Sequence, residues 1–237
     1  MQGQARQAGR VSTTEQANDL RAAVLGFNDG LVANLGLVMG VAGATLSSQA
    51  VIVAGMAGLI AGALSMALGE WISVQSSREM YQSRLAALSS GFAQRPAETR
   101  AKLVEMAKAR GSSDTAAYAD RLMQDRDQAL GALAGYELGI AVDDIGGSPW
   151  GAAAMAFVLF PAGAILSLIP FFFATDHGVA VSASLGLAGL GLFAVGAAIT
   201  RFTGRSLWFS GFRQLAFGVS AALVIYGVGR LFGHLVT

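Results

Sequence analysis

The chain has 237 residues, of which 54% are hydrophobic and 13% are charged, with 31 glycines and a formal net charge of +1. Soluble domains carry about 25% charged residues, so this composition indicates a membrane protein. The small net charge argues against a nucleic-acid partner, because phosphate binding requires clustered basic residues. The chain contains no cysteine, which excludes disulfides and thiolate metal sites. Any metal ligands must therefore offer oxygen, imidazole or thioether groups.

The amino terminus, residues 1–21, is polar, and the first apolar run starts too late and extends too far for a signal peptide. We therefore expect the first span to remain in the mature protein. Five segments are long and apolar enough to cross a bilayer, which takes about 20 helical residues. They run approximately over Val24 to Leu46, Val51 to Val74, Gly151 to Ala174, Val179 to Ile199 and Phe212 to Phe232.

Basic residues set the expected orientation of these spans. Lys and Arg gather in residues 1–21, in residues 78–126 and in residues 201–213, whereas the connections 47–50 and 175–178 contain none. Loops rich in Lys and Arg stay on the cytoplasmic side. We therefore expect a cytoplasmic amino terminus and an outer carboxyl terminus, most simply in a bacterial inner membrane.

Residues 76–147 differ sharply from the rest, because they carry ten acidic and nine basic side chains. Leucine, methionine and alanine recur there at helical spacing, while Pro96 and the stretch 111–114 predict breaks. Ser113 or Asp114 is expected to cap the following helix, and residues 146–149 to end the domain. The prediction is an all-α membrane protein of five transmembrane helices with a helical cytoplasmic insertion between the second and third. We expect residues 1–75 to form the cytoplasmic amino terminus and the first two spans, residues 76–147 the cytoplasmic helical domain, and residues 148–237 the last three spans.

Asp29 lies inside the uncharged stretch 24–46. An ionised side chain in hydrocarbon costs about 2.5 to 3.5 kcal/mol on insertion scales, so such residues usually face a wet cavity and mark an ion or proton path. The alternative is an acid near a helix end that reaches back to the headgroups.

A second polar group lies near the end of the second span. Met66 and Glu70 are four residues apart, and Ser73 and Ser77 continue nearly the same helical face. Counting residues from the membrane surface places Asp29 and Glu70 at a similar depth in the inner leaflet. Two acids, a thioether and nearby serine and asparagine oxygens suit a divalent cation such as Fe²⁺ or Mn²⁺. Met66 as a core filler and Glu70 as an interfacial carboxylate remain the alternatives.

Three glycine pairs with small-xxx-small spacing predict close helix contacts, namely Gly36 with Gly40, Gly58 with Gly62, and Gly229 with Gly233. In a chain so rich in glycine they predict packing and not function.

The sequence resembles the vacuolar iron transporter family, in its bacterial and nodulin-21-like branch. The resemblance rests on Asp29-Gly-Leu-Val-Ala-Asn-Leu-Gly-Leu-Val-Met-Gly-Val-Ala-Gly-Ala44, on Ala61-Gly-Ala-Leu-Ser-Met-Ala-Leu-Gly-Glu-Trp-Ile-Ser-Val-Gln-Ser76 and on Tyr136-Glu-Leu-Gly-Ile140. The family's five spans with a helical cytoplasmic insertion agree with the layout above, so the resemblance covers nearly the whole chain.

This resemblance implies a homodimer that moves Fe²⁺, and often Mn²⁺, out of the cytoplasm in exchange for protons, without a prosthetic group. Asp29 resembles the family's first-span acid, and Met66 the methionine of its second span. Glu70 fits the Gly-Glu-aromatic version of the motif. A carboxylate that alternately holds a metal and a proton couples their fluxes, because each occupant lowers the affinity for the other.

The chain departs from the family in the cytoplasmic insertion. Family members that bind metal there carry several glutamates at helical spacing, whereas residues 81–91 contain none. Other expected ligands or acids are replaced by Gly58, Thr99, Lys102 and Leu133. Glu137 is retained by motif, and Glu98 and Glu105 are possible substitutes for the missing ligands. A solvated helical bundle that stabilises a dimer is therefore as good an interpretation as a metal-binding domain.

Two other functions stay open from the sequence. One is a proton-coupled carrier of another small cation, and the other is a membrane scaffold or sensor that keeps the fold without transport. An enzyme is not expected, because His177 and His234 have no evident nucleophile nearby.

Overall fold

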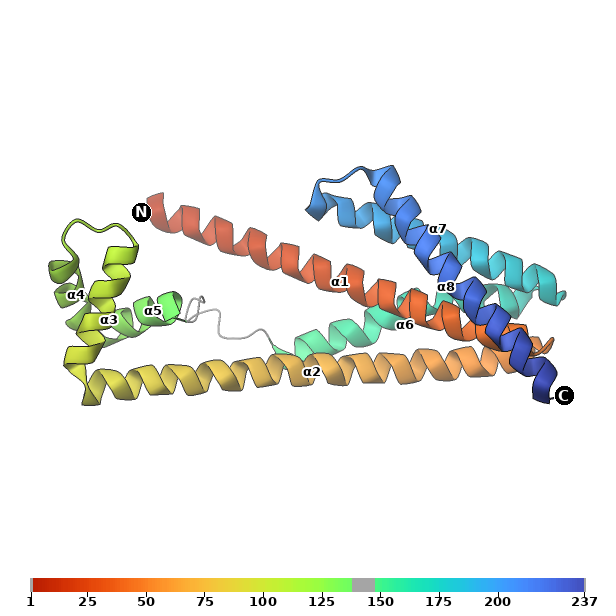
Figure 1. The fold of residues 1–237 in the computed structure, drawn as a ribbon, viewed down its shortest axis with the longest axis horizontal. Coiled ribbons are helices and arrows are strands. Elements are labelled where there is room, and N and C mark those ends of the chain that lie inside the picture. The colour runs from red at the N-terminus through yellow and green to blue at the C-terminus, as the bar shows by residue number, and fades with distance from the viewer. Residues whose placement is uncertain (1, 138–147, 237) are drawn as a thin grey trace. The chain divides into compact units, whose positions relative to one another are not determined.

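The computed structural model describes residues 2–137 and 148–236, all in helices or the short connections between them. The predicted all-α class is confirmed, because this part of the chain contains no strand (Figure 1). The helices are α1 (Gln2–Ala44), α2 (Ser48–Gln94), α3 (Pro96–Ala109), α4 (Thr115–Met123), α5 (Arg126–Glu137), α6 (Pro149–Phe173), α7 (His177–Thr203) and α8 (Leu207–Val236).

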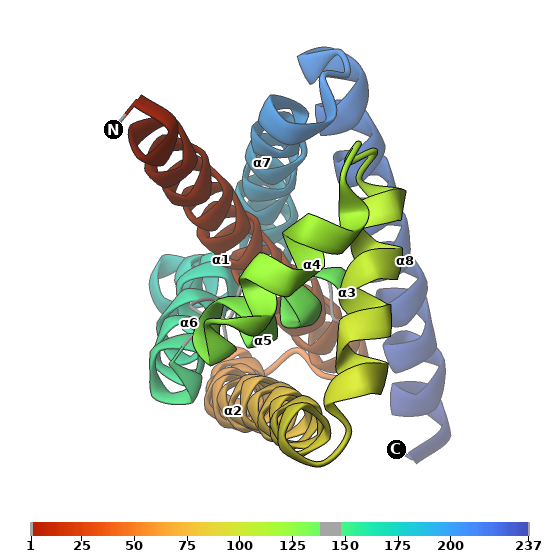
Figure 2. The same ribbon diagram turned by 90° about the vertical axis from the view of Figure 1, so that its left-hand side faces the viewer.

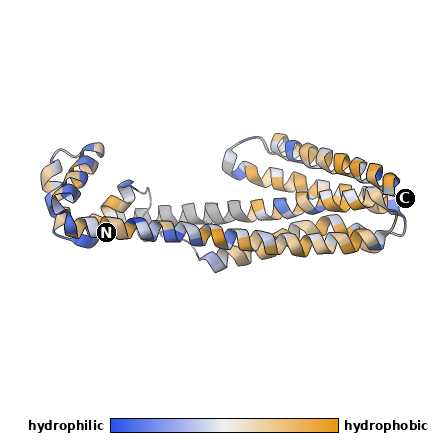
Figure 3. Ribbon diagram, turned by 60° about the horizontal axis from the view of Figure 1, so that its bottom comes forward, coloured by the Kyte–Doolittle hydropathy of each residue, from blue (hydrophilic) through white to orange (hydrophobic). Residues whose placement is uncertain are grey.

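Five stretches within these helices are long and apolar enough to cross a membrane, which confirms the five predicted spans. They are Ala23–Ala44, Ser48–Gln94, Pro149–Phe173, His177–Arg201 and Leu207–Leu235. Figure 3, in which the ribbon is coloured by residue hydropathy, shows mostly hydrophobic residues along the membrane-spanning helices and many hydrophilic residues in the short helices of the segment between α2 and α6. Pro161 and Pro170 lie inside α6, which continues through both of them.

Side-chain caps fix several helix ends. Asp114 caps the start of α4 and Asp176 caps the start of α7, each accepting a hydrogen bond from the backbone N–H three residues later, at 3.1 Å and 2.9 Å. Ser148 does the same before α6, with Pro149 at the first helical position, where its missing N–H is not needed. Gly204 follows α7 as its C-cap with a φ of 63°, a left-handed conformation that favours glycine. The predicted cap at Asp114 is confirmed.

The chain divides into two compact units. The first consists of Met1–Gly69 and Ala153–Thr237, in which α1 packs against α7 and α8, and α7 packs against α8. Its buried core includes Leu31, Leu35, Met39, Leu168 and Leu192.

The second unit, Glu70–Ala152, overlaps the predicted insertion 76–147 but begins earlier, inside α2. Its helices α3, α4 and α5 pack on one another around Leu103, Met106 and Leu133 (Figure 2). Arg100 binds the Asp120 carboxylate through two hydrogen bonds of 2.5 Å and 3.0 Å. These bonds lower the pKa of Asp120. The expected end of this domain falls partly outside the described residues.

Candidate metal site

Asp29 is an exposed acid in the apolar part of α1. Its neighbour Gly30 is buried against α6, and Asn28 accepts a hydrogen bond from Gln214 of α8 at 2.7 Å. Asp29 takes part in none of the ion pairs found among the described residues. Because hydrocarbon does not solvate a carboxylate, this side chain needs water, a partner or a cation in the bilayer.

Met66 lies on α2 in the same unit and is half-buried. A β-carbon added at Gly26 would lie 3.5 Å from the Met66 methyl carbon, so the thioether side chain reaches the helical turn that precedes Asp29. Met66 also packs on the edge of the buried core. Both interpretations of Met66 therefore keep support, since it fills space and lies one turn from the unpaired acid.

Glu70 is exposed and is the first residue of the second unit, whereas Asp29 belongs to the first. The expectation that Asp29 and Glu70 lie at a similar depth in the inner leaflet therefore stays a prediction. Next to Glu70, the indole ring of Trp71 meets that of Trp150 edge-on, with ring centres 5.9 Å apart.

Two of the three candidate glutamates in the second unit already have cationic partners. Lys102 Nζ donates to Glu137 Oε1 at 2.7 Å, and Arg95 donates to Glu98 at 3.3 Å. Glu105 is exposed. The described residues contain no group of three or more His, Asp or Glu side chains placed to hold a metal. Leu133, where a methionine was expected, is buried in the hydrophobic core of this unit.

Because lysine already pairs with Glu137, we expect this unit to contribute little metal binding. Titrating the purified full-length protein with Mn²⁺ should give similar stoichiometry for the natural chain and Glu137→Gln. Lys102→Met, which frees the Glu137 carboxylate, should add weak binding. Several tight sites that survive in Asp29→Asn but disappear in Glu137→Gln would contradict this expectation.

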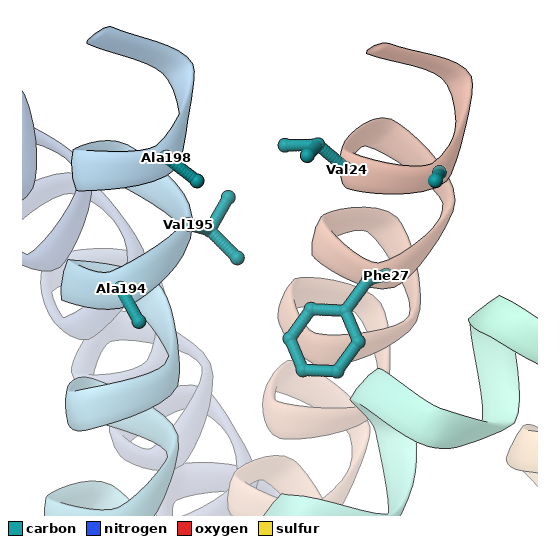
Figure 4. Close-up of a pocket in the computed structure, with 6 residues that line it drawn as sticks. Val24, Phe27, Ala194, Val195 and Ala198 are labelled. Carbon is teal, nitrogen blue, oxygen red and sulfur yellow. The ribbon is translucent and has the colours of Figure 1, made fainter. Parts of the chain in front are cut away.

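A pocket between α1 and α7 is not a metal site. It has a volume of about 290 Å³ and is lined by Ala23, Val24, Phe27, Ala194, Val195 and Ala198 (Figure 4). None of these side chains offers an oxygen, nitrogen or sulfur ligand. A hydrated cation has nothing to bind there.

Sequence reasoning missed several polar contacts inside the first unit. Asn34, with 3% of its surface exposed, donates to α6, and His177 makes a 2.9 Å hydrogen bond to the carbonyl of Ala42 at the end of α1. The pair of Asn28 and Gln214 joins α1 to α8. No short motif marks such contacts, because their partners are more than 100 residues away in the sequence.

Five helices long and apolar enough to cross a membrane define a multi-pass membrane protein, and the apolar part of the first carries an acid that makes no ion pair among the described residues. Comparison with known proteins identifies the family. The model of the VIT family matches residues 20–230. Vacuolar iron transporter homolog 1 of Oryza sativa subsp. japonica is 34% identical over 225 residues, 95% of this chain and 78% of that protein.

Two further proteins of the same plant are also similar. Vacuolar iron transporter homolog 2 is 31% identical over 92% of both chains. Vacuolar iron transporter 1 is 26% identical over 89% of this chain and 84% of that protein. The chain belongs to the VIT family, whose members are transporters and not enzymes.

Proposed function

We propose that this protein exports Fe²⁺, and also Mn²⁺, from the cytoplasm in exchange for protons. The observation that carries the proposal is Asp29, an acid without an ion-pair partner among the described residues, inside an apolar span of a chain related to iron transporters. The names of the similar plant proteins support a metal ion as the cargo.

Proton exchange follows from the chemistry of a carboxylate. A metal ion binds the ionised form, and a proton competes for the same oxygens. When Asp29 releases a metal to the outside and returns protonated, one proton enters for each cycle of that group. The chain would then use a proton gradient as its energy source.

The exposure of Asp29 also supports the proposed homodimer. In a single chain this side chain is open on the surface of an apolar helix. A second copy covering α1 would remove the carboxylate from lipid and enclose it in a shared polar passage. We propose that the protein lies in a bacterial inner membrane. In this orientation the amino terminus and the second unit lie in the cytoplasm.

Reconstitution of the full-length protein into liposomes tests this function directly. Anaerobic Fe²⁺, Mn²⁺ and Zn²⁺ are each offered outside vesicles that contain a metal-sensitive dye, with and without an imposed pH gradient. We expect Fe²⁺ and Mn²⁺ uptake above that of empty liposomes, accelerated when the metal-accepting side is acidic. Absence of uptake for every ion would favour a scaffold or sensor, and uptake indifferent to pH would exclude proton exchange.

Met66 and Glu70 give a second test of the pathway. Glu70→Gln removes a charged oxygen ligand and should strongly weaken uptake of every divalent ion. Met66→Leu keeps the packing but removes the thioether, which binds softer ions, so Fe²⁺ uptake should fall more than Mn²⁺ uptake. The measurement is the initial rate of uptake at several concentrations of each metal.

Met56→Leu is the matched control for Met66→Leu. Met56 also lies on α2 and packs on the same core, so the change in side-chain shape is the same. We expect no change in metal preference there. Equal, mild losses for all ions in both leucine variants would identify Met66 as a core residue only.

A further inference from the structure

Asn34 is the centre of a buried hydrogen-bonded cluster in the first unit. Its Nδ2 donates to the carbonyl of Ala164 at 2.9 Å and to Ser167 Oγ at 3.3 Å, both on α6. Ser167 Oγ in turn donates to the Ala164 carbonyl, and Ser184 of α7 donates to the Ser167 carbonyl at 2.6 Å. The cluster therefore ties α1, α6 and α7 together inside the apolar core.

These bonds determine which way the amide points. A backbone carbonyl only accepts hydrogen bonds, so the group of Asn34 that faces Ala164 must be the NH₂. Its oxygen, Oδ1, then faces the other side, where it is buried and has no hydrogen-bond partner. Leaving a buried acceptor unpaired costs about 1 to 3 kcal/mol. A group maintained at that cost calls for an explanation.

The unpaired oxygen faces α2 at Gly58. A β-carbon added at Gly58 would lie 3.2 Å from Asn34 Oδ1 and 3.2 Å from Leu37 Cδ1. Only the hydrogen atoms of a glycine separate the amide oxygen from the α2 backbone. Gly58 is therefore the smallest residue that can cover Asn34 Oδ1, and any movement of α1 away from α2 would expose this oxygen.

Asn34 also lies on the contact between α1 and α2, which begins in the turn before Asp29. Gly26 of α1 meets Met66 of α2, and Asn34 meets Gly58, so eight residues forward along α1 correspond to eight residues back along α2. The two helices are antiparallel and in register. Asp29 lies between these contacts in sequence, and Asn34 is five residues further, about 7.5 Å along the helix axis.

We propose that Asn34 Oδ1 is a second oxygen ligand for the divalent cation, reached after Asp29 when α1 and α2 separate at Gly58. The proposal rests on the transport function proposed above. A neutral amide oxygen suits harder cations such as Mn²⁺, whereas the Met66 thioether suits softer ones. Asn34 is thus a specificity-determining residue that favours Mn²⁺, and its lack of charge lets the ion move on.

The test compares Asn34→Leu with Ser184→Ala in the full-length protein. Asn34→Leu removes the oxygen, and Ser184→Ala removes a hydrogen bond of the same cluster but keeps that oxygen. Mn²⁺ binding is measured in detergent from the spectroscopic signal of the free ion, and concentration-dependent uptake of Mn²⁺ and Zn²⁺ is measured in liposomes.

In Asn34→Leu we expect Mn²⁺ affinity to fall about tenfold. This is the low end of the loss of metal affinity that follows when a residue supporting a metal site is replaced. Zn²⁺ should be affected much less, and Ser184→Ala should keep the natural preference between the ions. If Asn34→Leu does not fold, Gly58→Ala replaces it, because its methyl group would cover Oδ1 without removing the bonds to α6.

Equal losses for both ions in the Asn34 and Ser184 variants would overturn the proposal, because they would show a purely structural role. Unchanged Mn²⁺ affinity in a folded Asn34 variant would also overturn it. If the natural protein moved no ion at all, the transport function would fail separately, and the Mn²⁺ binding comparison alone would then decide whether Asn34 is a ligand.

Discussion

Asp29→Asn is expected to reduce metal uptake to the level of empty liposomes while leaving the protein folded. Asparagine keeps the volume of the side chain but removes the charge that attracts the metal and the group that accepts the exchanging proton. Asp29 is exposed and makes no ion pair among the described residues, so its replacement breaks no salt bridge. The measurement is initial Fe²⁺ and Mn²⁺ uptake, with elution volume and melting temperature as checks of folding.

Asp176→Asn is the matched control, since it is the same chemical change in an acid that lies between two spans. Asp176 caps α7 by accepting a 2.9 Å hydrogen bond from Val179 N, and asparagine caps helices equally well. Its uptake should equal that of the natural protein. If Asp29→Asn also transported at the natural rate, Asp29 would not be the central residue of the pathway.

The sequence predicted the five spans well because lipid imposes a simple requirement. Each span needs about 20 apolar residues, and every predicted segment coincides with a helix, although those ending at Leu46 and Ala174 run one or two residues past the helix end. Helix ends were harder to predict, since hydropathy reports where a helix meets lipid and not where it stops. Hence α2 continues to Gln94, immediately before Arg95 and Pro96, and α1 extends back to Gln2.

The candidate site was only partly predictable. Asp29 stands out because a charge in an apolar stretch can be read directly from the sequence. The importance of Asn34 could not be read there, because its orientation is set by a carbonyl on α6, 130 residues away. Periodicity gives the face of a helix, but it does not give the partner across the contact or the atom that stays unpaired.

The glycine pairs predicted helix packing correctly, and the structure adds their partners. Gly36 and Gly40 both face Ile225 of α8, and Gly229 faces the backbone of Gly40. Gly26 and Gly30 of α1 both face α6 and show the same four-residue spacing, but spacing within one helix does not identify the helix that packs against it. The contact between α1 and α6 could therefore not be predicted from local spacing.

Gly30→Ala is expected to prevent stable folding. After Asp29→Asn, it is the second substitution for which we expect a large effect. A β-carbon at Gly30 would lie closer than 3.0 Å to the carbonyl oxygen of Phe160, and one at Gly163 would be as close to that of Phe27. The two contacts are reciprocal, since each glycine lets the backbone of the other helix approach. Overpacking a core costs about 1 to 3 kcal/mol when side chains can turn aside. A backbone carbonyl inside a helix cannot, so the helices themselves must separate.

Gly186→Ala provides the control, because a β-carbon there meets nothing within 4 Å and alanine is the better helix former. We expect it to leave folding intact, whereas Gly30→Ala and Gly163→Ala should give low yields, aggregated elution profiles and lower melting temperatures. A Gly30→Ala protein as stable as the natural one would show that α1 and α6 do not cross at this point. Asp29 and Asn34 both lie on this part of α1. That result would therefore also show that close packing of α1 on α6 does not hold the proposed oxygen ligands in place.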